Sequence, residues 1–218
     1  MIVLKWLGHL LFPPRCVLCG KILENQTDLC QNCRIHAPEC PISSEKRNFL
    51  DSWLALWYYE GIVPKSLILY KFYRRRSKAK SYGRLLAMKI REQHPKGLDL
   101  LVWIPVSTIR KIRRGYDQVE LLANVAGQEL GMKPTRLLKK LRNNPPQSTV
   151  KEEAARRANV LGVYRVTDPQ QVQGKSVLLL DDIITTGATA AEAARMLRMA
   201  GAEQVHFAAV AATRRGRK

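Results

Sequence analysis

Apolar runs and helix-like segments alternate along most of this chain. Runs typical of strands lie at 53–59, 100–106, 160–166, 176–181 and 204–211. Segments with apolar residues three or four positions apart lie at 63–73, 82–93, 117–130 and 151–158, and another follows the fourth run to about Ala200. Residues 107–115 are polar and basic and read as a loop. Strands that alternate with helices form a parallel sheet with ligands at the strand C-termini, so the pattern predicts an α/β fold.

The segment Val177–Thr189 places chemistry at the end of one predicted strand. Four aliphatic residues precede Asp181 and Asp182, whose carboxylates can accept hydrogen bonds from vicinal hydroxyls and can hold Mg²⁺. Residues 185–189 offer hydroxyls, backbone N–H groups and a glycine at the start of the next helix, where the dipole favours a phosphate. These groups suit a ribose 5-phosphate. The competing interpretation is an ordinary strand–turn–helix with a capping Thr, but two unpaired aspartates at a strand end are costly.

This segment resembles the phosphoribosyl pyrophosphate (PRPP) signature of type I phosphoribosyltransferases, and all thirteen positions fit it. The resemblance implies that the acids contact the ribose 2- and 3-hydroxyls, that the loop binds the 5-phosphate, and that Mg²⁺ binds with PRPP. The implied PRPP-binding set is Asp181, Asp182, Thr185, Thr186, Gly187, Ala188 and Thr189. In that family the loop after an earlier strand binds pyrophosphate. The corresponding candidates here are Ser107, Thr108 and Arg110.

Four cysteines near the N-terminus have the spacing of a metal site. Cys16 and Cys19 form one CxxC pair, and Cys30 and Cys33 form a second pair ten residues later. Four thiolates at this spacing can converge on one Zn²⁺, which would be structural because no coordination position stays open. Such binding is worth on the order of 10–16 kcal/mol in small peptides. Two disulfides are the alternative, without support from a secretory signal. Cys40 remains, as a buried thiol or a substitute ligand.

The composition of the chain indicates a class of binding partner. The 218 residues carry a formal net charge of +19, which indicates a polyanion such as nucleic acid or an anionic membrane surface. The alternative is a solvated basic surface without a partner. The basic residues crowd at 71–91, 110–114, 139–142 and 214–218. Aromatic residues among them could stack single-stranded bases or belong to the core; these are Tyr70, Phe72, Tyr73 and Tyr82.

The N-terminal segment 1–12 is apolar but too short for a signal peptide, and no run of 18 apolar residues predicts a transmembrane helix. We expect this segment to pack on the zinc module, with a weak membrane contact as the alternative. His9 and His36 are interpreted as surface residues. The expected location is cytoplasmic, with membrane association left open.

Further motifs resemble the ComF family. They are the stretch 114–123 (RGYDQVELLA), Gln147-Ser148 and the stretch 156–162 (RRANVLG), in order after the cysteine pairs. The resemblance covers about residues 11–212. It departs at Asp117, where Asn is usual, and at Phe72-Tyr73-Arg74, which leaves the role of the region around Lys71 open.

The residues in these motifs have chemistry of their own. Arg114 and Arg156 could clamp phosphates bidentately, and Gln118 and Asn159 could be amide hydrogen-bonders in a site. For each of the four, a helix cap or a surface salt bridge is the alternative.

The resemblance implies a parallel-sheet type I phosphoribosyltransferase-like domain at 46–212, preceded by a small four-cysteine zinc module at 1–45 and followed by a basic tail at 213–218. Residues 43–47 read as the linker between the two units. The implied function is a DNA-uptake factor in natural transformation with a PRPP pocket and affinity for single-stranded DNA. Competence DNA-translocation proteins at the inner face of the membrane are possible partners. The alternatives are an active phosphoribosyltransferase with an unknown acceptor, for which no catalytic base stands out, and a structural scaffold.

Overall fold

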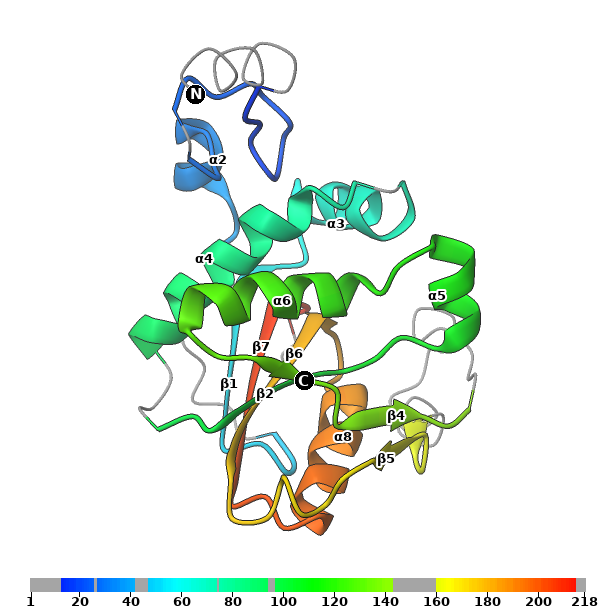
Figure 1. Cartoon of the computed structure of the whole chain (residues 1–218). Coiled ribbons are helices and arrows are strands. Elements are labelled where there is room, and N and C mark those ends of the chain that lie inside the picture. Colours follow the sequence, from blue (N-terminus) through cyan, green and yellow to red (C-terminus); the bar gives the residue numbers. More distant parts are fainter. Residues whose placement is uncertain are drawn as a thin grey trace, which may run out of the picture.

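The computed structural model describes residues 13–25, 27–41, 47–73, 75–93, 97–142 and 160–214. Figure 1 shows a central sheet with helices on both sides. The helices are α2 (Gln31–His36), α3 (Val63–Phe72), α4 (Lys78–Gln93), α5 (Thr108–Arg114), α6 (Gln118–Leu130) and α8 (Ala188–Met199). The strands are β1 (Ser52–Tyr58), β2 (Leu100–Trp103), β3 (Pro134–Thr135), β4 (Leu138–Lys140), β5 (Tyr164–Val166), β6 (Ser176–Ile184) and β7 (Gln204–Ala212).

The main sheet is parallel throughout and has the order β1-β7-β6-β2-β3. β6 lies in the middle, where Leu180 pairs with Ala208 of β7 and Trp103 of β2. β4 and β5 form a separate antiparallel pair. The predicted α/β fold is therefore confirmed. All strands of the main sheet end at one edge, which is the edge where parallel sheets bind ligands.

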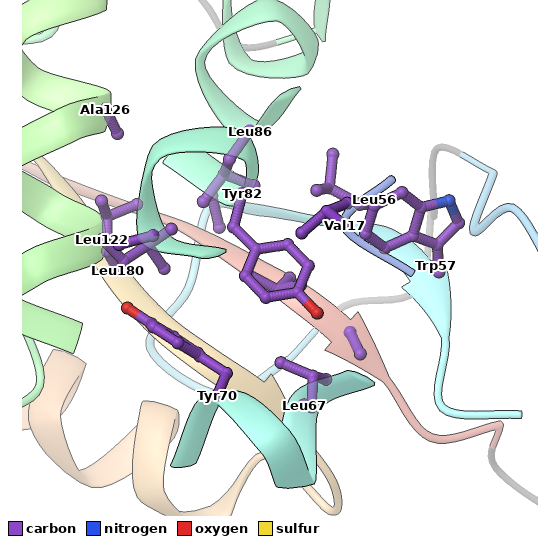
Figure 2. Close-up of a cluster of buried hydrophobic side chains, with 14 of the residues drawn as sticks. Val17, Leu56, Trp57, Leu67, Tyr70, Tyr82, Leu86, Leu122, Ala126 and Leu180 are labelled. Carbon is purple, nitrogen blue, oxygen red and sulfur yellow. The ribbon is translucent and has the colours of Figure 1, made fainter. Parts of the chain in front are cut away.

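The two faces of the sheet are covered by different helices, because alternate residues of a strand point to opposite sides. Leu178 and Leu180 of β6 pack in one cluster with α3, α4 and α6. Figure 2 shows this cluster, in which Tyr70 and Tyr82 lie near Leu180. Val177 and Leu179 pack in a second cluster with α8. The same alternation directs Asp181 and Asp182 to opposite faces of the sheet.

The cysteine-bearing segment is anchored to α3 and α4. Val17 lies in the core cluster with Trp57 and Tyr82 (Figure 2). The hydroxyl of Ser66 donates to the carbonyl of Val17 at 2.5 Å and lies 2.6 Å from the hydroxyl of Tyr82. Lys78 also donates to the Val17 carbonyl. Buried polar groups therefore join the segment between Cys16 and Cys19 to the helical layer.

Several expectations need correction. The segment 107–115 is mostly helix α5, because Ser107 caps its start and Gly115 ends it in the left-handed conformation, with φ at 77°. β2 ends at Trp103, before the predicted 106, and β5 begins only at Tyr164. The short strands β3 and β4 and the helix α2 were not predicted. β6 runs through both aspartates to Ile184, three residues further than expected.

Some expectations fall on residues outside those that the structure describes. These are the segment 1–12, the helix at 151–158, Gln147-Ser148, Arg156, Asn159 and the end of the basic tail. Within the described ranges, no helix is long and apolar enough to cross a membrane.

Candidate functional site

The two aspartates at the end of β6 have different surroundings. Asp182 is buried and faces α3 and α6, whereas Asp181 is half-buried and faces the loop before α8. The fully buried strand residues before them hold β6 at the centre of the sheet. Adjacent carboxylates are thereby presented on both faces of one strand at the ligand edge.

Both carboxylate oxygens of Asp182 have partners. The ammonium of Lys71 lies 2.8 Å from Oδ1, and the amide of Gln118 donates to Oδ2 at 2.8 Å. Lys71 comes from the last turn of α3 and Gln118 from the first turn of α6. These contacts offset the desolvation of the buried carboxylate, which would otherwise be costly.

Arg114 extends this network towards the surface. Its Nη1 donates to Oε1 of Gln118 at 2.8 Å, which fixes the amide so that its nitrogen faces Asp182. The Arg114 guanidinium carbon also lies 4.7 Å from the centre of the Phe72 ring. Because Phe72 follows Lys71 in α3, the side chains form a closed ring from Phe72 through Arg114, Gln118 and Asp182 to Lys71.

Asp181 is held in an environment that disfavours its charge. Burial and the neighbouring charge of Asp182 raise its pKa well above the ordinary value, although Lys71 opposes the shift. Its Oδ1 accepts the backbone N–H of Asp182 at 2.7 Å. A carboxyl of this kind gains most from a cation or a hydroxyl donor, so it fits the Mg²⁺ and the ribose hydroxyls that the motif implies.

The loop after β6 forms a hollow at the start of α8. The hollow opens to solvent, and its lining includes Asp181, Ile184, Thr185, Gly187 and Thr189. Gly187 adopts φ of 83° at the N-cap of α8, a conformation that favours glycine. The backbone N–H groups of the first turn of α8 lie at this end. Hydroxyls, N–H groups and a helix N-terminus together suit a phosphate.

Arg47 reaches the same loop from the segment before β1. Its side chain is buried and stacks on Trp53, with the guanidinium carbon 4.2 Å from the ring centre. A Cβ at Gly187 would lie 2.8 Å from Arg47 Nη1. The end of the predicted linker thus places a cation against the loop. The sequence carried no signal for this contact, because it depends on how segments far apart in the chain pack.

The expected pyrophosphate-binding residues lie at the start of α5, just beyond the C-terminal end of β2. Ser107 is buried and its hydroxyl accepts the N–H of Arg110 at 3.4 Å, so it acts as a helix cap. Thr108 is exposed. The charge of Arg110 lowers the pKa of Lys140, whereas the charge of Asp181 raises it. Arg110 therefore lies near Lys140, and its role as a pyrophosphate ligand stays a prediction.

Asp117 departs from the asparagine usual in the ComF motif, and the structure explains how the acid is used. Its Oδ1 accepts the N–H groups of Val119 at 2.9 Å and Glu120 at 3.2 Å, which caps α6. Its Oδ2 accepts the N–H of Val106 at 3.1 Å. Asp117 therefore joins the segment after β2 to the start of α6 and places Gln118 beside β6. Lys71, whose role was open, is explained by its ion pair with Asp182.

The four predicted zinc ligands converge. The Sγ atoms of Cys16, Cys19, Cys30 and Cys33 all lie within 4.8 Å of one another, and those of Cys19 and Cys30 are 3.7 Å apart. The described cysteines form no disulfide. A tetrahedral site with Zn–S distances of about 2.3 Å fits this cluster. Cys40 lies in the core cluster beside α8, apart from the four converging cysteines, so it is a buried thiol and not a substitute ligand.

The aromatic residues near the first basic cluster divide into two groups. Tyr70 and Tyr82 are fully buried, and their ring centres lie 5.5 Å apart at an interplanar angle of 64° (Figure 2). They are core residues, so the expectation that they could stack bases is wrong. Phe72 and Tyr73, in contrast, are 50% and 65% exposed. These two rings remain available to a ligand.

Comparison with known proteins matches both parts of the chain. Residues 104–218 match the family model described as phosphoribosyl transferase domain, and residues 7–45 match the double zinc ribbon domain. The DNA utilization protein YhgH of Salmonella typhi is 28% identical over 87% of this chain and 86% of its own. Competence protein F of Haemophilus influenzae is 26% identical over 88% and 82%. Orotate phosphoribosyltransferase of Pyrococcus horikoshii is 28% identical over 57% and 62%.

Proposed function

Because this chain belongs to the phosphoribosyl transferase domain family, joined here to a double zinc ribbon, we propose that it is a DNA-uptake factor of natural transformation that binds PRPP with Mg²⁺ and has affinity for single-stranded DNA. The relatives named for DNA utilization and for competence match most of the chain and support this role. Under this proposal the protein acts in the cytoplasm, beside the competence DNA-translocation proteins at the inner face of the membrane.

The observation that carries the PRPP proposal is the placement of Asp181 in the lining of the hollow at the start of α8, with Asp182 next to it on the other face of β6. The loop Thr185–Thr189 would bind the 5-phosphate through its hydroxyls and N–H groups. The two acids would accept hydrogen bonds from the ribose hydroxyls. Before the ligand binds, Lys71 and Gln118 hold the carboxylate of Asp182 in place. Mg²⁺ bound with PRPP would supply charge neutralisation at the pyrophosphate.

The alternative is an active phosphoribosyltransferase that acts on an unknown acceptor. Catalysis would then come from Mg²⁺ and from cations that stabilise pyrophosphate as it leaves. Arg110 and Lys140 favour this alternative, because the pKa of Lys140 is affected by the charges of both Arg110 and Asp181, so that cations lie near an acid of the motif. In the described part of the chain, no side chain stands out as a general base, so an acceptor would have to bring its own nucleophile in reactive form.

Calorimetric titration with PRPP and Mg²⁺ tests the proposal, with the double substitution Asp181→Asn and Asp182→Asn as the variant. We expect the variant to lose PRPP binding and to keep its affinity for single-stranded DNA. Asp168→Asn, at a half-buried acid that does not line the hollow, is the matched control. A wild-type protein that does not bind PRPP would contradict the proposal. Release of pyrophosphate on incubation with candidate acceptors would favour the enzyme.

The DNA part is tested by the salt dependence of binding to an oligothymidylate. Affinity should fall steeply as salt rises, because bound Lys and Arg side chains displace counterions from the phosphates. A flat dependence would show that the charge of +19 serves another purpose.

A further inference from the structure

The end of α3 and the helix α5 together expose an unusual mixture of side chains. Aromatic and aliphatic groups lie among arginines, and this α3–α5 surface comprises Phe72, Tyr73, Arg75, Arg76, Ile112 and Arg113. Ile112 is 76% exposed, which is more than any other large hydrophobic residue in the described ranges. Burial of exposed apolar groups against a ligand is favourable, so their exposure beside cations indicates a surface that binds a ligand.

Direct contacts join the two elements into one surface. Arg76 Nη2 donates to the Gly115 carbonyl at 3.1 Å, and its guanidinium carbon lies 4.8 Å from the centre of the Tyr116 ring. Arg114 covers one face of Phe72 in the same way. Figure 1 shows α3 and α5 on the same side of the molecule. The spacing of the exposed groups is therefore set by packing between the two elements.

The charge of this surface selects a polyanion. α3, α5 and the segment between α3 and α4 contain no Asp or Glu. An apolar protein partner would have to desolvate the arginines, at a cost that its own apolar groups could not repay. Phosphates pair with arginines, and unpaired bases offer flat faces to exposed aromatic rings. Duplex DNA satisfies only the first requirement, because its bases are already stacked.

We propose that single-stranded DNA binds across the α3–α5 surface, with bases stacked on Phe72 and Tyr73 and phosphates on Arg75, Arg76 and Arg113. This inference rests on the proposed affinity for single-stranded DNA and assigns it a place. The surface adjoins the acid pair, since Lys71 precedes Phe72 and Arg114 contacts both Phe72 and Gln118. A strand bound here passes beside the PRPP site.

Binding of a labelled oligothymidylate, followed by fluorescence anisotropy at fixed salt, tests the stacking. The double substitution Phe72→Ala and Tyr73→Ala should weaken binding by about five-fold or more for each ring. Phe49→Ala is the matched control, because this ring is similarly exposed, at 48%, but lies outside the surface. A duplex of the same length should compete poorly. Equal competition by duplex would overturn the stacking and leave only a charged surface.

The arginines have a separate readout in the salt dependence. The double substitution Arg75→Ala and Arg113→Ala should reduce the slope of log affinity against log salt by about 1.4, or about 0.7 for each phosphate that is no longer neutralised. Lys133→Ala with Lys175→Ala removes the same charge just before β3 and β6, at the opposite edge of the sheet, and should change the slope little.

The outcomes separate this inference from the proposed function. If the wild-type protein binds the oligothymidylate and both double variants bind as tightly as their controls, the surface is wrong and the DNA affinity stands. If the wild-type protein does not bind it at all, both fail. The mutated side chains are exposed, so unfolding midpoints close to wild type are expected and confirm that the variants fold.

Discussion

Lys71 of α3 and Asp182 of β6 form an ion pair at 2.8 Å, with side chains that are 19% and 6% exposed. The pair joins the helical layer to the central strand at the edge where the PRPP motif lies. A helix outside the motif therefore supplies the cation that holds one of the two acids in the motif.

Loss of this cation should destabilise the protein. Lys71→Met leaves the buried carboxylate of Asp182 with Gln118 as its remaining side-chain donor. Breaking a buried pair from one side costs about 3–5 kcal/mol, and the partial exposure of Lys71 places the expected loss at the lower end of that range. Urea denaturation measures it. Lys111→Met is the control, since its pair with Glu120 has the same length of 2.8 Å but is 43% and 34% exposed. Equal losses in the two variants would contradict the prediction.

The charged carboxylate of Asp181 should lower the free energy of unfolding when no ligand is bound. Its pKa is raised in the folded state, so the folded state binds more protons than the unfolded state above the ordinary pKa of 3.8, and stability falls as pH rises. Asp181→Asn should therefore be more stable than wild type at pH 7, where the charge of the buried carboxylate is unfavourable.

The gain from Asp181→Asn should shrink as pH falls and disappear well below the ordinary pKa of 3.8, where wild-type Asp181 is protonated in both states. Unfolding experiments at several pH values measure the difference, with Asp168→Asn as the control. A loss of stability at pH 7 would show that Asp181 is a structural residue and not one reserved for a ligand.

Lys140 should take up a proton when PRPP binds. Burial and the charge of Arg110 lower its pKa to about 8, whereas the ordinary value is 10.5. Between these values the unfolded state binds more protons, so stability without ligand rises with pH across this range. A polyanion nearby favours the charged amine.

Calorimetry at pH 8.5 in buffers of different ionisation enthalpy measures the proton uptake on PRPP binding. Lys140→Met should abolish it. Lys139→Met, at the exposed neighbour on the other face of β4, should not. If the wild-type protein binds PRPP without taking up a proton, Lys140 is too far from the bound ligand for its pKa to change.

Removal of zinc should weaken the main domain as well as the ribbon. The carbonyl of Val17, between two zinc ligands, accepts hydrogen bonds from Ser66 and Lys78. If the knuckle unfolds, the buried hydroxyl of Ser66 and the ammonium of Lys78 lose this acceptor, at about 1–3 kcal/mol for an unsatisfied group. Because α3 carries both Ser66 and Lys71, PRPP affinity should fall too.

The zinc prediction is tested with Cys33→Ser, by metal content, thermal unfolding and PRPP titration. Cys40→Ser is the control and should keep its zinc, because Cys40 lies in the other core cluster. Full PRPP affinity in zinc-free protein would show that the ribbon and the site are independent.

Local patterns sufficed for the parts of the molecule that are contiguous in the chain. The apolar run before Asp181, the glycine loop that follows it and the paired CxxC spacing each encode their own geometry, because their residues are neighbours in sequence. The alternation of strands and helices likewise predicted the parallel sheet. The helix at Thr108–Arg114 was missed because most of its residues are basic and none is buried, so its signals are Ser107 and Gly115 at the two ends.

Folding decided which distant residues meet. Gln118 lies 64 positions before Asp182 yet donates to its carboxylate, and Arg47 reaches the loop at Gly187 from the segment before β1. Tyr70 and Phe72 are two residues apart in one helix, but one ring is buried in the core and the other faces solvent. Such differences arise from helix orientation and packing between layers, which depend on the whole set of contacts. The residue types of the motifs are thus determined by the local sequence, whereas their electrostatic environment is determined by the tertiary packing.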